Sequence, residues 1–370
     1  MLGERQISNK ELSIVLEAPR KVSHKYFDIP SIGSEEMLLE VEAVSICGSD
    51  AERYVGVRFG GPLASPLPII MGHELVGRVG EIGQEASKFY GVKQSDRVIV
   101  EPYILCGKCR YCLTGYYQLC VRMRCYGINI SCNEPPHLWG AYGQYMYVAP
   151  NSRVHKIASN VPKEEACLAS TIGNGIRWIC TKGDVRSGDT AVVVGPGPQG
   201  LATVTVADYV GAGKIILAGT SVDKSRLQLS REFGADYTVN VDEENLVDRV
   251  KDITSGEMVD VAVFTTGSTR AMSEATRLVK PLGTCVIPGL TGGKTVPMIT
   301  DEIVTKELRI VGGLGQSWNV EAAISLLEKQ KYPVKKMATH ILPLEEADRG
   351  LKLAANEIEG EEPIKVVLTP

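Results

Sequence analysis

Four cysteines lie close together in the first third of the chain, with spacings of three, three and eight residues: Cys106, Cys109, Cys112 and Cys120. Four thiolates can surround one Zn²⁺ ion tetrahedrally and leave no coordination position open. The alternative is a loop of free cysteines, in which Gly107, Gly115 and polar neighbours would leave the thiols exposed to oxidation. The spacing therefore predicts a structural zinc that stabilises its own lobe.

A second group of possible ligands precedes this lobe. Cys47 is followed by Gly-Ser-Asp, and His73-Glu74 stands in a glycine-rich run. A thiolate and an imidazole leave positions open for water or substrate, as a catalytic zinc requires. A cysteine and a histidine this far apart are also common as unrelated core residues, so the pair alone does not decide between the two interpretations.

The third chemical signal is a glycine turn. The apolar run 191–194 enters Gly195-x-Gly197-x-x-Gly200, and small and apolar residues follow over 201–210. Gly195 permits the turn, Gly197 lets the backbone approach a pyrophosphate, and Gly200 lets a helix close on a strand. The amino end of that helix attracts phosphate. This order predicts a dinucleotide site.

Two kinds of fold must position these residues. After the glycine turn, strand-like runs alternate with helical stretches at the intervals of a doubly wound parallel sheet, so we expect an α/β domain. Before it, strand-like runs follow one another without crossover helices, as in a largely antiparallel domain. The strands expected are 13–16, 36–44, 74–79, 191–194, 215–218, 237–240, 259–263, 284–287, 308–313 and 364–368, and the helices are 201–210, 225–233, 271–280 and 320–330.

Composition narrows the partners. The chain has 370 residues with 40 basic and 44 acidic side chains, a formal net charge of −4 and no basic block, which argues against nucleic acid and anionic membranes. Residues 1–6 do not resemble a signal peptide, and no later apolar run approaches transmembrane length. We therefore expect a cytoplasmic protein whose ten cysteines are thiols or metal ligands rather than disulfides.

These motifs, in this order, resemble those of the zinc-containing medium-chain alcohol and polyol dehydrogenases, and the resemblance runs nearly end to end. The matching stretches are 47–50, 72–83, 96–98, Glu101-Pro102, the four-cysteine lobe, 143–145, 188–190, the Gly195 turn, Thr339-His340 and 343–347. The resemblance implies a GroES-like, mainly β catalytic domain built from 1–155 and 298–370, which includes the four-cysteine lobe. It also implies a Rossmann coenzyme domain over 156–297, with the substrate in the cleft between the two domains.

The resemblance also implies roles for individual residues. Cys47 and His73 would hold a catalytic zinc, and Ser49 would bind the substrate hydroxyl and start a proton relay. Asp50 and Glu74 would support the ligands from behind. Zinc would lower the pKa of the alcohol, and the carbinol hydride would pass to a nicotinamide.

Two departures from the family pattern leave alternatives open. Thr171 stands where relatives commonly place a third Cys or Glu ligand. Glu74 could complete the catalytic site with a water, and Cys167 could do so only if its helix shifted by a turn. Alternatively, the site could hold zinc weakly or not at all. Glu52 stands where many relatives carry a relay histidine, and it either passes protons or is a solvated loop residue.

Cofactor choice depends on the end of the second strand of the nucleotide fold. An acidic residue there binds both ribose hydroxyls of NAD, whereas this chain has Ser221, with Lys224 and Arg226 close behind. The sequence therefore favours NADP(H) over NAD(H), although the two cations could be ordinary surface charges and NAD could be bound through hydroxyl partners. Thr266 ends a later strand, where its backbone could contact the cofactor.

The leading hypothesis is a zinc-dependent NAD(P) oxidoreductase with one catalytic and one structural zinc, acting on a secondary alcohol or polyol and its ketone. One alternative is a zinc-poor reductase of activated alkenes or quinones on the same fold, and another is a non-enzymatic nucleotide-binding or structural protein. The region 286–313 resembles the family's subunit contact, so a homodimer or homotetramer is expected. Pocket residues are expected from 54–62 and around Trp318, and no role is assigned to 121–138.

Overall fold

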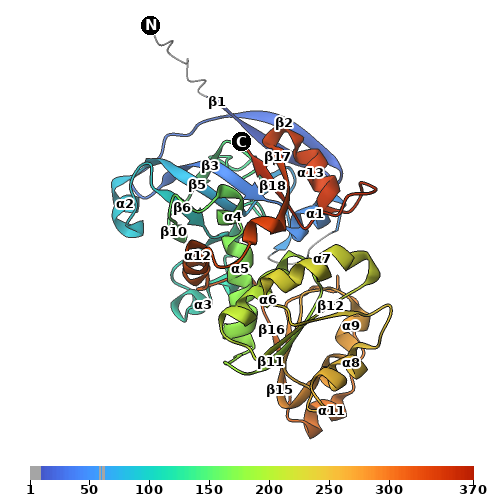
Figure 1. Ribbon diagram of the computed structural model, residues 1–370. Helices are drawn as coiled ribbons and strands as arrows, with labels where there is room; N and C mark the ends of the chain where they lie inside the picture. Colours follow the sequence, from blue (N-terminus) through green and yellow to red (C-terminus); the bar gives the residue numbers. More distant parts are fainter. Residues whose placement is uncertain (1–9, 58–59, 61–62) are drawn as a thin grey trace. The chain divides into compact units, whose positions relative to one another are not determined.

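A computed structural model describes residues 10–57, 60 and 63–370 (Figure 1). The expectation for residues 1–6 and part of the expected pocket loop 54–62 therefore lie outside the described residues. By internal contacts the chain divides into two units, one comprising Met1–Ala169 and Val334–Pro370 and the other Ser170–Pro333. The first unit is discontinuous in sequence, so its last strands come from the end of the chain.

The first unit is built mainly from β-strands. Its largest sheet has the order β10-β6-β5-β3-β18-β17, with β9 paired to β3, and most neighbours in it are antiparallel. A three-stranded sheet has the order β2-β1-β4, and β7 pairs with β8. The strands are β1 Lys10–Ala18, β2 Lys21–Asp28, β3 Met37–Ser45, β4 Ile69–Ile70, β5 Glu74–Ile82, β6 Arg97–Val100, β7 Tyr103–Ile104, β8 Arg124–Cys125, β9 Tyr145–Val148, β10 Val154–Lys156, β17 Ala338–Pro343 and β18 Lys365–Thr369.

Short helices connect these strands and cover their ends. They are α1 Gly48–Tyr54, α2 Gln84–Tyr90, α3 Arg110–Leu113, η2 Tyr117–Leu119, α4 Lys163–Ala166, η6 Val334–Met337, η7 Leu344–Glu346 and α13 Ala347–Ala354. The apolar face of the sheet forms the core, which includes Leu39, Val44 and Leu75. In the centre of the sheet, a Cβ at Gly77 would lie 2.4 Å from the carbonyl oxygen of Glu40, so this crossing of β3 and β5 requires glycine.

The second unit contains a six-stranded parallel sheet in the order β13-β12-β11-β14-β15-β16. This is the doubly wound order, in which the direction of winding reverses between β11 and β14 and ligands bind at the carboxyl ends of the strands. The strands are β11 Thr190–Val194, β12 Lys214–Gly219, β13 Tyr237–Asn240, β14 Val259–Phe264, β15 Val279–Ile287 and β16 Arg309–Gly312. The expected GroES-like and Rossmann fold class is confirmed.

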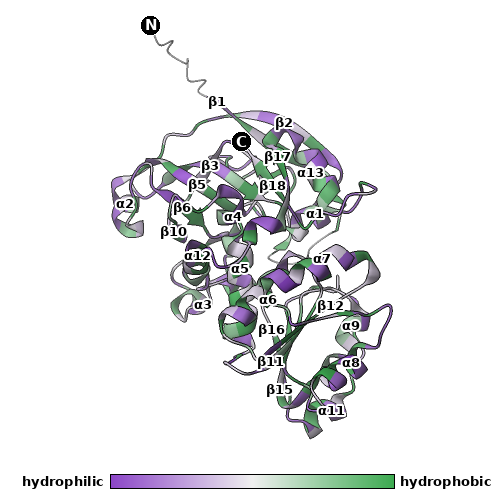
Figure 2. Ribbon diagram, viewed as in Figure 1, coloured by the Kyte–Doolittle hydropathy of each residue, from purple (hydrophilic) through white to green (hydrophobic). Residues whose placement is uncertain are grey.

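Helices cover this parallel sheet. They are α5 Ala169–Ile176, the π-helix η3 Arg177–Lys182, α6 Pro198–Tyr209, η4 Ser221–Asp223, α7 Lys224–Leu229, η5 Ser230–Phe233, α8 Leu246–Ile253, α9 Thr269–Ser273, α10 Ala275–Leu278, α11 Thr300–Thr305 and α12 Val320–Glu328. Figure 2 shows strands such as β11 in mainly hydrophobic colours, whereas α8 carries both hydrophobic and hydrophilic residues. Buried strands are apolar throughout because helices cover both faces of a parallel sheet.

The expected elements are found in the structure, with two differences in the helices. The expected helix 225–233 is α7 followed by the 3₁₀-helix η5, and the expected helix 271–280 is interrupted and ends early. The expected helix 271–280 is two short helices, α9 and α10, and the chain becomes extended at Val279, where β15 begins. Val279 pairs with Val259 at the start of β14, so sheet pairing overrides the helical pattern there. Among the described residues, every helix is too short or too polar to cross a membrane.

A buried carboxyl group in the first unit makes its stability depend on pH. Glu11 on β1 is fully buried and accepts hydrogen bonds from the hydroxyl of Ser13 and the backbone amides of Gln144 and Tyr145. Burial outweighs these bonds and raises the pKa of Glu11 from 4.5 to about 7. The folded state therefore binds a proton that the unfolded chain releases between these two pH values.

We predict that the wild-type protein loses about 2 to 3 kcal/mol of stability, relative to Glu11→Gln, as the pH rises from about 4.5 through about 7. The raised pKa stabilises the fold fully below the unfolded value, and this contribution disappears above the folded value. Thermal unfolding of both proteins at pH 5 and pH 8 measures the difference. A parallel pH dependence in the two proteins would contradict the prediction.

Candidate functional site

The candidate catalytic cluster consists of Cys47, His73 and Glu74. Cys47 is the N-cap of α1, just beyond the end of β3, and Glu74 is the first residue of β5. The antiparallel pairing of β3 with β5 places Ser45 opposite Glu74, which brings the two distant segments together. One ligand atom from each of the three residues lies within 4.8 Å of the others.

His73 lies in surroundings that favour a cation. Its side chain is buried, and its Nδ1 lies 3.6 Å from Oδ1 of Asp50. Neither of these two buried atoms has a hydrogen-bond partner among the described residues. Burial alone would lower the pKa of His73, but the charges of Asp50 and Cys47 outweigh it and raise this pKa to about 9. Zn²⁺ binds Cys, His and carboxylate ligands, so the donor set fits this metal.

Glu74 is held from behind by a buried lysine. Its carboxylate contacts Nζ of Lys365 on β18 and accepts a hydrogen bond of 2.5 Å from the hydroxyl of Ser45. Burial acts against ionisation of Glu74, but the charge of Lys365 lowers its pKa below the usual value. The Lys365 ammonium also donates to the carbonyl of Ile46, 2.9 Å away. The same carboxylate oxygen, Oε2, thus accepts from both Ser45 and Lys365.

Lys365 is a site residue that the sequence reasoning missed. It is a single charged residue in the otherwise apolar strand β18, and it is buried. A lone lysine inside an apolar strand is the signal that could have found it, because lysine is rarely buried without a partner.

Helix α1 carries the remaining candidates. Asp50 is fully buried, and its Oδ2 accepts from the backbone amide of Cys47 and from the hydroxyl of Tyr142, each at 3.1 Å. These bonds fix the first turn of the helix beside the cluster. Ser49 is half-buried, and Glu52 is exposed one turn further along. Residues three apart lie on the same face of a helix, so a proton could pass between these two side chains.

The three candidates for a third ligand of the catalytic site, Thr171, Cys167 and Glu74, lie in different places. Thr171 lies buried in α5 and belongs to the second unit. Cys167 is a buried residue at the end of α4, where its thiol donates to the carbonyl of Glu164 at 3.5 Å and burial raises its pKa. Among the described residues, Cys167 does not join the cluster. Of these candidates, only Glu74 lies with Cys47 and His73.

The four cysteines of the lobe converge as the spacing predicts. Their ligand atoms lie within 4.8 Å of one another, and the Sγ atoms of Cys106 and Cys112, like those of Cys109 and Cys120, are 3.9 Å apart. Four sulfurs around zinc would be separated by about 3.8 Å, since a Zn–S bond is about 2.3 Å long. The backbone amide of Cys112 donates to Sγ of Cys109, which lowers the pKa of Cys109 to about 6.

The segment 121–138, which had no expected role, packs beside this lobe. Its strand β8 pairs with β7, and its buried Cys125 joins a small core with Tyr103 and Tyr117. Cys125 and Cys132 are both buried and do not belong to the cysteine cluster. The segment therefore supplies an apolar base for the lobe.

The glycine turn has the geometry of a tight strand-to-helix connection. Gly195 has φ of +108°, and Gly197 is the N-cap of α6, where a side chain would meet nothing within 4 Å. A Cβ at Gly200 would lie 1.9 Å from the carbonyl oxygen of Gly195, so only glycine fits there. The turn leaves open space above Gly197 and the amino end of α6.

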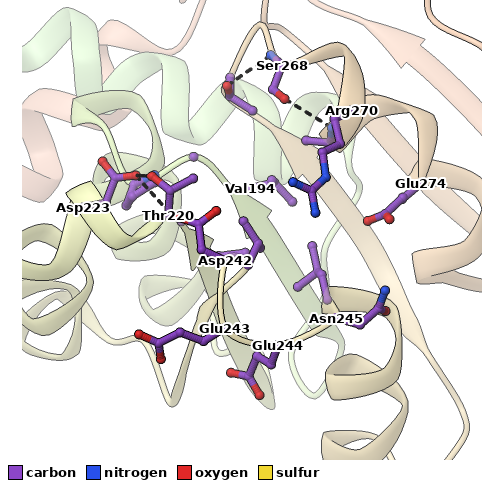
Figure 3. Close-up of a pocket in the computed structure, with 18 residues that line it drawn as sticks. Val194, Thr220, Asp223, Asp242, Glu243, Glu244, Asn245, Ser268, Arg270 and Glu274 are labelled. Atoms are coloured by element: carbon purple, nitrogen blue, oxygen red, sulfur yellow. Dashed lines mark hydrogen bonds between the residues drawn. The ribbon is translucent and has the colours of Figure 1, made fainter.

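A pocket of about 440 Å³ opens beside this turn, at the carboxyl ends of the parallel strands (Figure 3). Gly195 and Thr266 line it, and the Thr265 hydroxyl donates to the Gly195 carbonyl at 2.8 Å. Three residues expected to select the cofactor do not line the pocket, namely Ser221, Lys224 and Arg226, although Arg226 donates to the lining residue Asp223 at 3.1 Å. The remaining lining residues include Pro196, Thr220, Asp223, Asp242, Asn245, Ser268, Arg270 and Glu274.

Comparisons with known proteins agree with this architecture. Residues 33–159 match the alcohol dehydrogenase GroES-like domain, and residues 198–329 match the zinc-binding dehydrogenase domain. The chain is 37% identical, over 97% of its length and 98% of the relative's, to a probable alcohol dehydrogenase of Mycobacterium tuberculosis. It is 32% identical to the erythritol/L-threitol dehydrogenase of Mycolicibacterium smegmatis, with 99% of each chain covered.

Among solved structures, a zinc-binding dehydrogenase of Sinorhizobium meliloti 1021 bound to NADP is similar at a TM-score of 0.86. The two sequences are 26% identical, over 98% of this chain and 100% of the other. The fold and site thus define a two-domain NAD(P)-dependent oxidoreductase that acts on CH–OH groups. The chain belongs to the zinc-type medium-chain dehydrogenase family, on its alcohol and polyol dehydrogenase side. The non-enzymatic alternative is set aside.

We predict that Cys109→Ser removes one zinc per chain and lowers Tm by about 10 °C, because metal binding contributes directly to the folding of such a lobe. Metal analysis and thermal unfolding measure both effects. Cys180→Ser is the matched control, since Cys180 is a free cysteine outside the cluster. Unchanged zinc content in Cys109→Ser would show that the four thiols hold no metal.

We also predict that Lys365→Met destabilises the protein by about 3 kcal/mol or more, because it leaves the buried carboxylate of Glu74 without its cation. The double variant Glu74→Gln/Lys365→Met should recover much of this loss, since it removes both charges. Chemical denaturation of the wild type, Lys365→Met, Glu74→Gln and the double variant forms a complete cycle. Additive effects would mean that the two side chains do not compensate each other.

Proposed function

We propose that the protein is a zinc-dependent NAD(P) oxidoreductase that interconverts a secondary alcohol or polyol and its ketone by hydride transfer. The observation that carries the proposal is the convergence of Cys47, His73 and Glu74. A zinc-poor reductase would not need these side chains together. The named activities of relatives, among them erythritol/L-threitol and sorbitol dehydrogenases, support a polyol or related alcohol as substrate.

Cys47 and His73 would hold the catalytic zinc, with Glu74, whose carboxylate lies beside them, as a third ligand. When bound, the metal would supply Lewis-acid polarisation of the substrate oxygen, and the nicotinamide would accept the hydride. Asp50 would fix the orientation of the His73 ring across the 3.6 Å gap between them. Tyr142 and the Cys47 amide hold Asp50 in place for that task.

The proton of the alcohol needs a path to solvent. Ser49 would accept it at Oγ, and Glu52 lies one turn away on the exposed side of α1. A carboxylate in this position would take the role that histidine has in many members of the family. The exposure of Glu52 supports this arrangement, since the last group of a relay must exchange protons with water.

The four-cysteine cluster would hold a second, structural zinc. Four thiolates leave no position open for substrate, so this ion would stabilise the lobe without taking part in the reaction. The chain would therefore carry two zinc ions, one for each cluster. The division into a catalytic and a coenzyme domain also stays part of the proposal, expected over 1–155 with 298–370 and over 156–297; the pairing of β16 with β15 favours a later return to the catalytic domain, at Val334.

The nicotinamide dinucleotide would lie over Gly195, Gly197 and Gly200, with Thr266 beside it. The open space above Gly197 and the amide groups at the amino end of α6 suit a pyrophosphate. The prediction that the cofactor is NADP(H) rests on Ser221, Lys224 and Arg226 and stays a prediction.

A homodimer or homotetramer is also part of the proposal. Strand β16 lies at the edge of the parallel sheet, and its Arg309, Ile310 and Gly312 are exposed. An edge strand presents unpaired backbone groups that can pair with another chain. A second copy of the chain could pair with this edge and satisfy its backbone groups. The mass of the protein in solution measures the oligomeric state.

We predict that Cys47→Ala and His73→Ala each lower kcat/KM for the preferred alcohol by about 1000-fold or more, because each removes a ligand of the group that polarises the substrate. The measurement is turnover of a panel of secondary alcohols, polyols and activated alkenes, together with metal analysis. The wild-type protein should carry two zincs and form ketones, whereas the variants should keep the structural zinc.

Cys180→Ser is again the control variant and should retain full activity. Reduction of activated alkenes by a wild-type protein with one zinc would favour the zinc-poor reductase instead. Full alcohol turnover in Cys47→Ala would refute the proposed mechanism while leaving the family and the fold unaffected.

A further inference from the structure

The pocket beside the glycine turn carries a carboxylate that the sequence argument about cofactor choice did not include. The residues used to predict the cofactor all follow β12, namely Ser221, Lys224 and Arg226. In the structure, the parallel pairing of β12 with β13 places Gly219 opposite Asn240, so the residues after β13 lie beside those after β12. Asp242 lies two residues beyond the end of β13 and lines the pocket.

Asp242 is hydrogen-bonded to Ser221, which stands where NAD-binding folds usually have an acidic residue. Its Oδ2 accepts a hydrogen bond of 2.8 Å from the backbone amide of Ser221. The hydroxyl of Ser221 accepts a bond of 3.0 Å from the side-chain amide of Asn240. A carboxylate is therefore present next to Ser221, although it comes from the neighbouring strand. Its second oxygen, Oδ1, makes no hydrogen bond within the described part of the chain and is available to a ligand.

The nearby cations do not offset this charge. Arg226 donates from NH1 to Oδ1 of Asp223 at 3.1 Å, and Asp223 also accepts from the amide and hydroxyl of Thr220. Lys224 is exposed and does not line the pocket. Arg226 is thus engaged by a carboxylate of the pocket wall, and Lys224 is not part of the pocket lining.

The charges that do line the pocket are mainly negative. Arg270 and Glu274 lie on the side opposite Asp223, Thr220 and Asp242 (Figure 3). Glu243 and Glu244 lie on the lower rim, with carboxylates that point away from Thr220 (Figure 3). Five carboxylates and a single guanidinium therefore line this space. A ribose with two free hydroxyls can donate to a carboxylate, whereas a ribose phosphate brings more negative charge to the same place.

We propose that Asp242 is the residue that selects the cofactor, by accepting a hydrogen bond from the adenosine ribose of NAD(H) and repelling the 2′-phosphate of NADP(H). This inference rests on the proposed dinucleotide site at the glycine turn. The proposed preference for NAD(H) is the opposite of the preference for NADP(H) expected from the sequence. The difference arises from Asp242, which only the register of β12 and β13 brings beside Ser221.

The test is direct binding of NADH and NADPH to the full-length protein, followed by the change in nicotinamide fluorescence. The wild-type protein should bind NADH at least about 10-fold more tightly than NADPH, as expected when a charged acceptor is gained by one ligand and opposed by the other. Asp242→Asn should lower this ratio by about 10-fold or more. Asparagine can still accept from the Ser221 amide, so the loop should keep its shape.

Glu243→Gln is the matched control, because it removes one charge from the same rim at a carboxylate that points away from Thr220. It should change the ratio by less than about 3-fold. Tighter binding of NADPH by the wild-type protein, or an equal change in both variants, would overturn the role of Asp242 and leave the dehydrogenase proposal intact. Failure to bind either cofactor would instead refute the proposed dinucleotide site and this inference with it.

Discussion

The catalytic unit depends on one buried ion pair, between Glu74 on β5 and Lys365 on β18. Both side chains are nearly inaccessible to water, and each would be costly to bury alone. The pair joins two strands that lie on either side of β3, the strand that leads into Cys47. The positions of the thiol, the imidazole and the first turn of α1 all follow from this contact and from the register of β3 against β5.

A second buried carboxylate connects the cysteine lobe to the same sheet. Glu101 accepts a hydrogen bond of 2.6 Å from the hydroxyl of Tyr117, and its other oxygen lies 2.8 Å from Nε2 of His155 on β10. Tyr117 stands in η2, three residues before Cys120. The lobe is thus attached to the large sheet by this buried carboxyl group as well as by the apolar contacts of Cys125.

Much of this could be predicted from the sequence where the signal was local. The spacing of Cys106 to Cys120 and the glycines at 195, 197 and 200 involve neighbouring residues, so their geometry follows from short-range constraints. The order of strands and helices also followed from hydrophobic periodicity, which repeats over short windows. The partners of Lys365 and Asp242 could not be predicted in this way. Each becomes a site residue only through the register of two strands that are distant or separate in sequence, and no local pattern specifies that register.

The first unit is built from both ends of the chain, and this affects the order in which it can assemble. The chain emerges from the ribosome with Cys47, His73 and Glu74 first, then the whole nucleotide-binding unit, and only afterwards β18 with Lys365. Until that last strand arrives, the nascent catalytic half holds an uncompensated acid at its centre. The cluster of Cys47, His73 and Glu74 therefore gains its buried cation only after the second unit has been made, and that unit can fold as an insert before the first unit is complete.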